Sequence, residues 1–212
     1  MKIALIGIGG HSKVIQEMIS EQAGWEIIGY FDDQYEQEFF KDECYFGPIQ
    51  TSLKMHEYFC DVKYLVAIGN NRTRKSIVEK LNLPADSYAT LVHKSSIISK
   101  RAIIGHGTVV MPGAVVNTDS QIGQHSIINT NAVIEHDNML GSYVHISPNA
   151  TLTGNVKAGD GVQVGAGAAV IPSKSIGEWA IIGAGGVVIE DIPSYSLAVG
   201  VPAKSLRNTG EV

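Results

Sequence analysis

The chain has 212 residues, of which 44% are hydrophobic and 17% charged, and its formal net charge is −5 at pH 7. This composition excludes a mainly disordered chain, and no apolar run reaches the roughly 20 residues that cross a bilayer. No block of Lys and Arg indicates a nucleic-acid surface. With two cysteines and no hydrophobic targeting core at its start, we expect a cytoplasmic protein without nucleic-acid or membrane partners.

Residues 1 to about 90 alternate between strand and helix patterns. KIALIG is a buried-strand run, GIGGH is a glycine turn, and SKVIQEMISEQ has apolar residues at helical spacing. EIIGYFDD and KYLVAIGNN read as two further strands, and RTRKSIVEKLN reads as a helix. Such alternation predicts a small parallel sheet with ligand chemistry at the carboxyl ends of its strands. The residues at those ends are Gly9, Gly10, His11, Asp32, Asp33, Gly69, Asn70 and Asn71.

The first of these loops, GIGGHS, resembles a dinucleotide-binding turn but has Ser12 where the third glycine belongs. Free N–H groups at a helix start can still receive a phosphate or another polar ligand. The carboxylates of Asp32 and Asp33 can receive donors from a ribose or a base. Two alternatives remain open, which are a purely structural glycine turn and a solvated strand end at the two aspartates.

The second half of the chain has a six-residue repeat. Counting in steps of six from Ile98 to Val188 meets sixteen consecutive aliphatic positions, which we call slots. The glycine content and Pro112, Pro148 and Pro172 exclude a helix. A period of six predicts a hexapeptide β-helix with one short strand and one tight turn per repeat, and three repeats per triangular coil.

The repeat also predicts how side chains are distributed. Slot residues point into the prism, small residues four places after a slot fit inside the tight coil, and Gly and Asn allow positive φ at the corners. The 90 residues between the first and last slot make five coils of eighteen without an insertion. The hand of the coil does not follow from the period.

Two histidines in the repeat are candidates for chemistry. Neither His136 nor His145 occupies a slot, so both are expected on the surface. One coil away from His136 in either direction are Thr118 and Gly154, which are small enough to leave room for a ligand. Asp137 is the expected partner that holds the imidazole in one tautomer and makes it a neutral base. The alternative is an exposed histidine without a role.

Metal and nucleophile chemistry are disfavoured. The candidate zinc ligands are separated by 19, 11 and 9 residues, which neither returns them to one face of an eighteen-residue coil nor places two close together. These candidates are His106, His125, His136 and His145. No catalytic cysteine motif, GxSxG elbow or pair of catalytic carboxylates is present, so we expect no metal and no acyl-enzyme.

An ordered set of motifs spans the chain from residue 2 to about 207, namely GIGGHSKV, FDD, AIGNN, LVHKSSIIS, IINTNAVIEHD, VHISPNATLTGNVKAG, IIGAGGVV and VGVPAK. Through them the sequence resembles the bacterial nucleotide-aminosugar and sialic-acid acetyltransferase family. The resemblance implies a Rossmann-like βαβ sugar-nucleotide domain at 1–92, a left-handed parallel β-helix at 93–190 and a tail at 191–212. It also implies a homotrimer that binds acetyl-CoA in grooves between neighbouring prisms.

The resemblance further implies roles for individual residues. His136 would be the general base, assisted by Asp137, where some relatives have glutamate. His145 would lie near the thioester, and Asn129, Gly154 and Gly165 would line the pantetheine groove. Lys204 or Arg207 would meet the phosphates of CoA. The sugar nucleotide would be held by Gly10, His11, Asp32, Asp33, Gly69 and Asn70.

These observations predict an acetyl-CoA-dependent N-acetyltransferase. Its substrate would be a UDP- or dTDP-linked 4-amino-4,6-dideoxy sugar used for a surface polysaccharide or glycan, acetylated by direct transfer. One alternative is O-acetylation of sialic acid, which would not need a nucleotide pocket. Another is a non-catalytic trimeric scaffold or sugar-nucleotide sensor, which would keep the prism without depending on His136.

Overall fold

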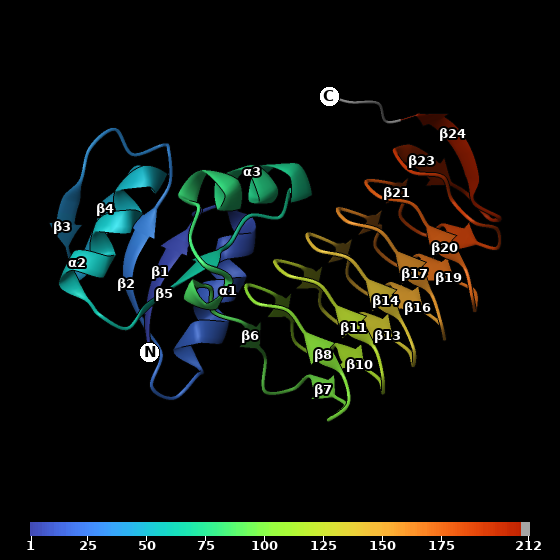
Figure 1. Cartoon of the computed structure of the whole chain (residues 1–212), viewed down its shortest axis with the longest axis horizontal. Coiled ribbons are helices and arrows are strands. Elements are labelled where there is room, and N and C mark those ends of the chain that lie inside the picture. The colour runs from blue at the N-terminus through green and yellow to red at the C-terminus, as the bar shows by residue number, and fades with distance from the viewer. Residues whose placement is uncertain (209–212) are drawn as a thin grey trace. The chain divides into compact units, whose positions relative to one another are not determined.

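The structure is a computed structural model that describes residues 1–208. The chain divides into two compact units, Met1–Leu91 and a second unit that begins at Val92. Figure 1 labels the elements of both units. Among the described residues, none of the helices has the length and apolar character needed to cross a membrane.

The amino-terminal unit is a five-stranded sheet in the order β3-β4-β2-β1-β5. Strands β1, β2, β4 and β5 run parallel, and β3 pairs antiparallel with β4. Its strands are β1 (Lys2–Ile6), β2 (Glu26–Phe31), β3 (Phe39–Lys41), β4 (Cys44–Gly47) and β5 (Val62–Val66). Its helices are α1 (Gly10–Ser20), α2 (Met55–Tyr58) and α3 (Asn71–Leu81), with 3-10 turns η1 (Ile49–Lys54) and η2 (Ala85–Ser87).

The predicted alternation of strands and helices is present in this unit. Four consecutive residues of β1 are buried, as expected of a central parallel strand. Helix α1 buries Ile15, Met18 and Ile19 on one face. Val14 is 38% exposed and lies outside this apolar face. The β3–β4 hairpin was not predicted, because its short aromatic strands carry no clear alternation of polar and apolar residues.

The second unit is a parallel β-helix built from two-residue strands, as the repeat predicts. Three ladders form its faces. Face 1 contains β6 (Leu91–Val92), β9 (Val109–Val110), β12 (Ile127–Ile128), β15 (His145–Ile146), β18 (Gln163–Val164), β21 (Ile181–Ile182), β23 (Ser196–Val199) and β24 (Lys204–Asn208). Face 2 contains β7 (Ile97–Ile98), β10 (Val115–Val116), β13 (Val133–Ile134), β16 (Thr151–Leu152), β19 (Ala169–Val170) and β22 (Val187–Val188). Face 3 contains β8 (Ile103–Ile104), β11 (Gln121–Ile122), β14 (Met139–Leu140), β17 (Lys157–Ala158) and β20 (Ser175–Ile176).

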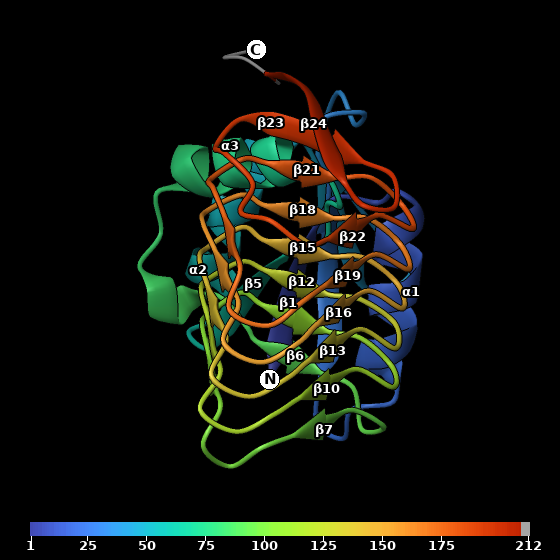
Figure 2. The same ribbon diagram turned by 90° about the vertical axis from the view of Figure 1, so that its right-hand side faces the viewer.

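The register of the ladders is eighteen residues throughout, as in Ile128 pairing with Val110 and Ile146. Figure 2 shows the stacked strands of faces 1 and 2. Every slot from Val110 to Val188 is at most 5% exposed, while Ile98 and Ile104 at the first coil are only partly buried. The prism interior is therefore a continuous aliphatic column, and the predicted inward slots are confirmed.

The corners take positive φ at Gly and Asn, as predicted, and at other residue types as well. Positive φ occurs at the third residue after every slot from Ile104 to Ile182, where Asp, Asn, His and Tyr are found as well as Gly. The glycines that directly follow slots are needed for a different reason. A Cβ on Gly123 would lie 2.5 Å from the carbonyl carbon of Gly141, so the next coil leaves no space for a side chain. These glycines permit close stacking of coils and not a left-handed backbone.

The tail closes the last coil. Strand β23 continues face 1 in parallel with β21, and β24 then turns back antiparallel to β23. This arrangement covers the carboxyl-terminal coil with hydrogen-bonded backbone.

Candidate active site

His136 lies on the edge between faces 2 and 3, which we call edge 2–3, in the turn from β13 to β14. Its side chain is 57% exposed, and its Nδ1 lies 2.8 Å from Oδ2 of Asp137. Asp137 occupies the left-handed corner position with φ +60°, which aspartate tolerates better than most residues. Because the carboxylate can only accept, it selects the tautomer with a proton on Nδ1. The lone pair of Nε2 is therefore available to take a proton.

The imidazole is seated over Gly154 in the following coil. A Cβ at that glycine would lie 2.5 Å from Cε1 and 2.7 Å from Nε2 of His136. Only a glycine permits the ring to lie in this position. The predicted triplet of His136, Asp137 and Gly154 is thus brought together by one edge of one chain.

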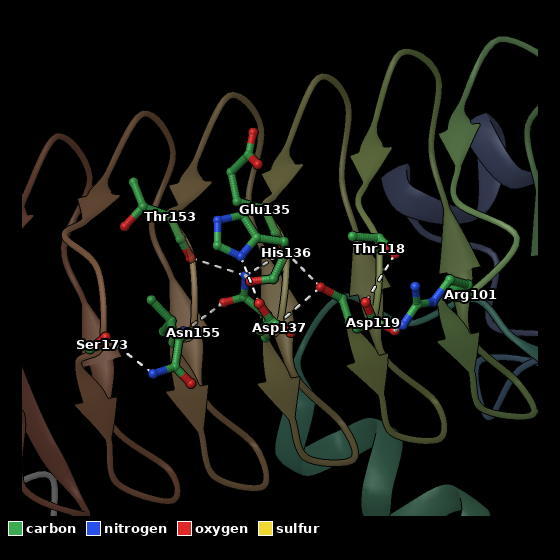
Figure 3. A network of polar contacts seen from close by, with 12 residues as sticks. Arg101, Thr118, Asp119, Glu135, His136, Asp137, Thr153, Asn155 and Ser173 are labelled. Carbon is green, nitrogen blue, oxygen red and sulfur yellow. Dashed lines mark hydrogen bonds and ion pairs between the residues drawn. The ribbon is translucent and has the colours of Figure 1, made fainter.

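Polar contacts continue along edge 2–3 on both sides of His136, as Figure 3 shows. Arg101 forms an ion pair with Asp119 at 2.7 Å, and Thr118 donates to the same carboxylate at 3.1 Å. In the other direction Asn155 donates to Ser173 at 3.1 Å. The exposed imidazole of His136 is therefore one position in a polar row and not an isolated side chain.

The second predicted group lies on a different side of the prism. His145 is in β15 on face 1, and its Nε2 lies 3.0 Å from Nδ2 of Asn129. The side-chain Oδ1 of Asn129 accepts from the Thr130 N–H at 2.8 Å, and this bond orients the side-chain amide so that its NH2 group faces the His145 ring. His145 is half-buried. Gly165 has a packing reason to be glycine, because a Cβ would lie 2.5 Å from the Ala184 nitrogen.

In a three-sided prism, edge 2–3 is opposite face 1. One chain therefore does not bring His136 and His145 together, and the resemblance assigned both to a groove between neighbouring prisms. Lys204 is exposed on β24, and the side chain of Arg207 lies outside the described residues.

The amino-terminal unit contains a second candidate region at the ends of β1 and β5. Helix α1 begins at Gly10, and its N-cap residue Gly9 provides no side-chain hydrogen bond to the free N–H groups. A Cβ at Gly9, Gly10 or Gly69 would meet no atom within 4 Å, and none of the three has positive φ. By contrast, Gly7 has φ +94° and lies too close to Ile68 for a side chain. The structure therefore gives no packing reason for three of the four glycines.

The two predicted aspartates fasten the loops around this region. Asp32 accepts from the N–H of Ile8 at 3.1 Å and from the N–H of Gln34 at 3.0 Å. Asp33 accepts from the N–H of Ile49 at 3.1 Å. Both side chains thus hold backbone in place, which argues against a merely solvated strand end. The side chain of Asn70 also holds backbone in place, since it caps α3 by accepting from the Thr73 N–H at 2.9 Å.

Burial, together with the nearby charge of Arg74, lowers the pKa of His11 to about 4. His11 is therefore neutral at physiological pH, and its Nε2 has no hydrogen-bond partner among the described residues. Arg74 is itself buried, and its guanidinium donates to the carbonyls of Ile68 at 2.8 Å and Gly69 at 3.1 Å. This arginine holds the loop after β5, and the sequence reasoning did not place it in the site.

A cavity of about 490 Å³ lies beside Asp32 and Asp33. One wall is a polar stripe of α3 that sequence reasoning also missed, and it is formed by Arg72, Thr73, Ser76 and Lys80. The spacing of four residues between Arg72, Ser76 and Lys80 is the signal that would have found it, because it aligns them on one helix face. A second cavity of about 600 Å³ lies along the later strands of face 3 and includes none of the predicted residues. No cluster of three or more metal-ligating side chains occurs in residues 1–208.

A hexapeptide β-helix with an exposed imidazole–carboxylate pair, joined to a separate parallel-sheet unit, defines the class of hexapeptide-repeat acyltransferases. Comparison with known proteins supports this class and narrows it. Residues 2–81 match the PglD N-terminal domain family. A curated relative, UDP-N-acetylbacillosamine N-acetyltransferase of Bacillus subtilis (strain 168), is 46% identical over 107 residues, which is half of each protein.

Two solved structures match nearly the whole chain. A mutant of perosamine N-acetyltransferase from Caulobacter crescentus, in complex with CoA and GDP-perosamine, is 34% identical with a TM-score of 0.87. That match covers 98% of this chain and 97% of the other. The acetyltransferase domain of PglB from Neisseria gonorrhoeae FA1090, in complex with acetyl coenzyme A, is 35% identical with a TM-score of 0.84, covering 97% and 98%. The chain therefore belongs to the nucleotide-aminosugar acetyltransferase family, whose members are acyltransferases, and the predicted fold class, a small α/β unit followed by a left-handed β-helix, is confirmed.

Proposed function

We propose that the protein transfers the acetyl group of acetyl-CoA to the 4-amino group of a nucleotide-linked 4-amino-4,6-dideoxy sugar. The nucleotide is UDP or dTDP, and the 46% identity to a UDP-N-acetylbacillosamine N-acetyltransferase favours UDP. The observation that carries the proposal is the exposed imidazole of His136, held by Asp137 and seated over Gly154.

The chemistry needs one base. As the sugar nitrogen attacks the thioester carbonyl, Nε2 of His136 takes the proton that the amine loses. The tetrahedral adduct collapses, the C–S bond breaks, and the imidazolium returns the proton to the leaving thiolate of CoA. Asp137 stabilises the imidazolium while it exists. A positioned base of this kind contributes roughly 10²- to 10⁴-fold. A backbone N–H or His145 would supply the donor for the oxyanion.

The proposed assembly is a homotrimer. The outward residues of face 2 are Ile97, Val115, Val133, Thr151, Ala169 and Val187, an almost wholly apolar row on a surface strand ladder. Packing face 2 of one copy against face 1 of the next closes after three copies, because each prism uses two adjacent faces. This packing brings edge 2–3 of one copy next to face 1 of its neighbour. His136 of one chain then meets the partner's His145, which explains why one chain separates them.

In this proposal the acetyl-CoA lies in the groove between neighbouring prisms. Asn129 and His145 contact the thioester end, Gly154 and Gly165 border the pantetheine, and Lys204 is available for the phosphates. The sugar nucleotide is held in the amino-terminal unit. Gly10 and Gly69 leave their backbone open to the diphosphate, and His11 offers a neutral ring. Asp32, Asp33 and Asn70 act mainly by fixing the loops that bind the ligand.

The test is release of CoA thiol from acetyl-CoA across a panel of UDP-, dTDP- and GDP-linked 4-aminosugars. The His136→Ala variant is expected to lose at least about 100-fold in turnover while it still binds acetyl-CoA. Added imidazole is expected to restore part of the turnover, because it supplies the missing base to an intact pocket. Unchanged turnover in His136→Ala contradicts the proposal. Turnover with GDP-aminosugars alone contradicts the nucleotide assignment only.

A further inference from the structure

Edge 2–3 contains a buried polar ladder beneath His136. At most of the positions four residues after a slot the side chain is buried in the prism, and most residues there are Ala or Val. On edge 2–3 this position is occupied by Ser120 and, one coil later, by Asn138, and both are fully buried. Asn138 is two residues from His136 in the chain. A buried amide in an aliphatic column is costly unless all its hydrogen bonds are made.

The hydrogen bonds of Asn138 join three successive coils. Its backbone N–H donates to the Ser120 hydroxyl at 3.2 Å, and its Oδ1 accepts from the Val156 N–H at 3.1 Å. Its Nδ2 donates to the Thr153 carbonyl at 3.0 Å. These bonds connect the coil of His136 with the coil before it and the coil that contains Gly154.

The same amide also reaches the peptide bonds on either side of His136. Nδ2 lies 2.6 Å from the Glu135 carbonyl oxygen and 3.3 Å from that of His136. The Glu135 carbonyl accepts a second bond from the Ser120 hydroxyl at 2.6 Å, and the His136 carbonyl accepts from the Asn155 N–H at 2.9 Å. Both carbonyls that flank the imidazole are therefore held from the interior of the prism.

An edge without a proposed base provides the comparison. On the edge between faces 3 and 1, Ser126 bonds the carbonyl of Gly141 at 3.3 Å and the N–H of Val144 at 3.1 Å. That ladder connects consecutive coils in the way that Ser120 does. The ladder ends at Val144. A buried hydroxyl that bonds the next coil therefore also occurs on an edge without a proposed base, and such a bond by itself indicates only a structural role. Ser126 also reaches one carbonyl of its own turn, that of Gln124 at 3.4 Å, so the additional feature at His136 is the second carbonyl that Asn138 holds, that of Glu135 at 2.6 Å.

We propose that Asn138, supported by Ser120, is a positioning residue for His136. The inference rests on the proposed function, since it assigns the amide a role in aiming the base. The backbone at 135–137 sets where the Cα–Cβ bond of His136 points, and a small misplacement of a base lowers turnover by up to about 100-fold. Substrate binding does not depend on this alignment to the same degree.

The experiment compares three variants in the full-length protein. Asn138→Val reproduces the residue found one coil later at Val156 and removes every side-chain bond. Asn138→Ser reproduces Ser120, keeping bonds to the next coil but losing the short bond to the Glu135 carbonyl. Ser126→Ala removes an equivalent bridge from the other edge and is the matched control. For each we would measure the melting temperature, kcat, and the KM for both substrates.

We expect both Asn138 variants to lose about 10- to 100-fold in kcat with each KM within about twofold of wild type. Asn138→Ser should melt close to wild type, and Ser126→Ala should lose melting temperature but keep its kcat. The inference is overturned if Asn138→Ser retains wild-type kcat, or if kcat follows melting temperature across all three variants. A His136→Ala variant with full turnover would instead overturn the proposed function, so the two failures are distinguishable.

Discussion

The space around the glycines differs between the two units of this protein. In the β-helix a Cβ at Gly123 would collide with the backbone of the next coil, so stacking requires the glycine. In the amino-terminal unit a Cβ at Gly10 or Gly69 would enter open space. Where neither packing nor φ requires glycine, the remaining reason is close approach of a ligand to the backbone. The comparison separates glycines that build the fold from those that we propose serve binding.

The strongest test of this comparison is Gly123→Ala. The added methyl would lie 2.5 Å from two backbone atoms of the neighbouring coil, which cannot move without unstacking the ladder. We expect a loss of roughly 3 kcal/mol, at the upper end for an overpacked core, or failure to fold. Urea denaturation measures it. A variant as stable as wild type would show that the coils can separate, and the packing account of these glycines would be wrong.

Gly154→Ala belongs to the same prism but meets a side chain instead of backbone. The new methyl would occupy the place of the His136 ring, which is exposed and free to swing away. We expect kcat to fall by about 10- to 100-fold with the melting temperature nearly unchanged. Steady-state kinetics and thermal denaturation on one preparation check both halves. Loss of stability with normal kcat would be the opposite of the expected pattern.

Gly10→Ala and Gly69→Ala test the other side of the comparison. Since no atom lies within 4 Å of the new methyl, we expect unchanged stability. The KM for the sugar nucleotide should rise by about tenfold, because the methyl would stand between the backbone N–H groups and the diphosphate. Titration calorimetry with UDP and with dTDP gives the binding change directly. Wild-type affinity in both variants would remove these loops from the proposed nucleotide site.

The last expected effect, which is absent at neutral pH, is a pH dependence of stability from His11. Its pKa is about 4 in the folded chain and 6.5 when unfolded, so between these values the unfolded state binds more protons. The free energy of unfolding should therefore fall as pH is lowered from 6.5 to 4, with a slope of at most about 1.4 kcal/mol per pH unit. Above pH 6.5 this histidine contributes no slope. His11→Asn should lack this component in urea denaturations at successive pH values, and identical slopes in both proteins would contradict it.

Much of the fold could be predicted from the sequence, because an aliphatic residue at every sixth position is buried when the chain winds into a hexapeptide β-helix. The slots from Val110 to Val188, the eighteen-residue register and the outward place of His136 all follow from counting. The pairing of His136 with Asp137 was also predicted, since adjacent residues at a tight corner stay within reach. The resemblance to a known family contributed the hand of the coil.

Other features depended on contacts between residues distant in the chain. The stripe of α3 beside Asp32 and the buried bonds of Asn138 are products of packing, whereas the place of Gly154 one coil from His136 follows from the register. The eighteen-residue register already places His136 and His145, nine residues apart, half a coil from each other, whereas no local pattern reports which carbonyls a buried amide will bond. The sequence by itself therefore determined the repeat, its inward and outward positions and the candidate base. Only the tertiary structure decided that the buried amide of Asn138 holds both carbonyls that flank His136 and that a polar stripe of α3 lies beside Asp32, because these contacts join residues whose packing no repeat or local pattern specifies.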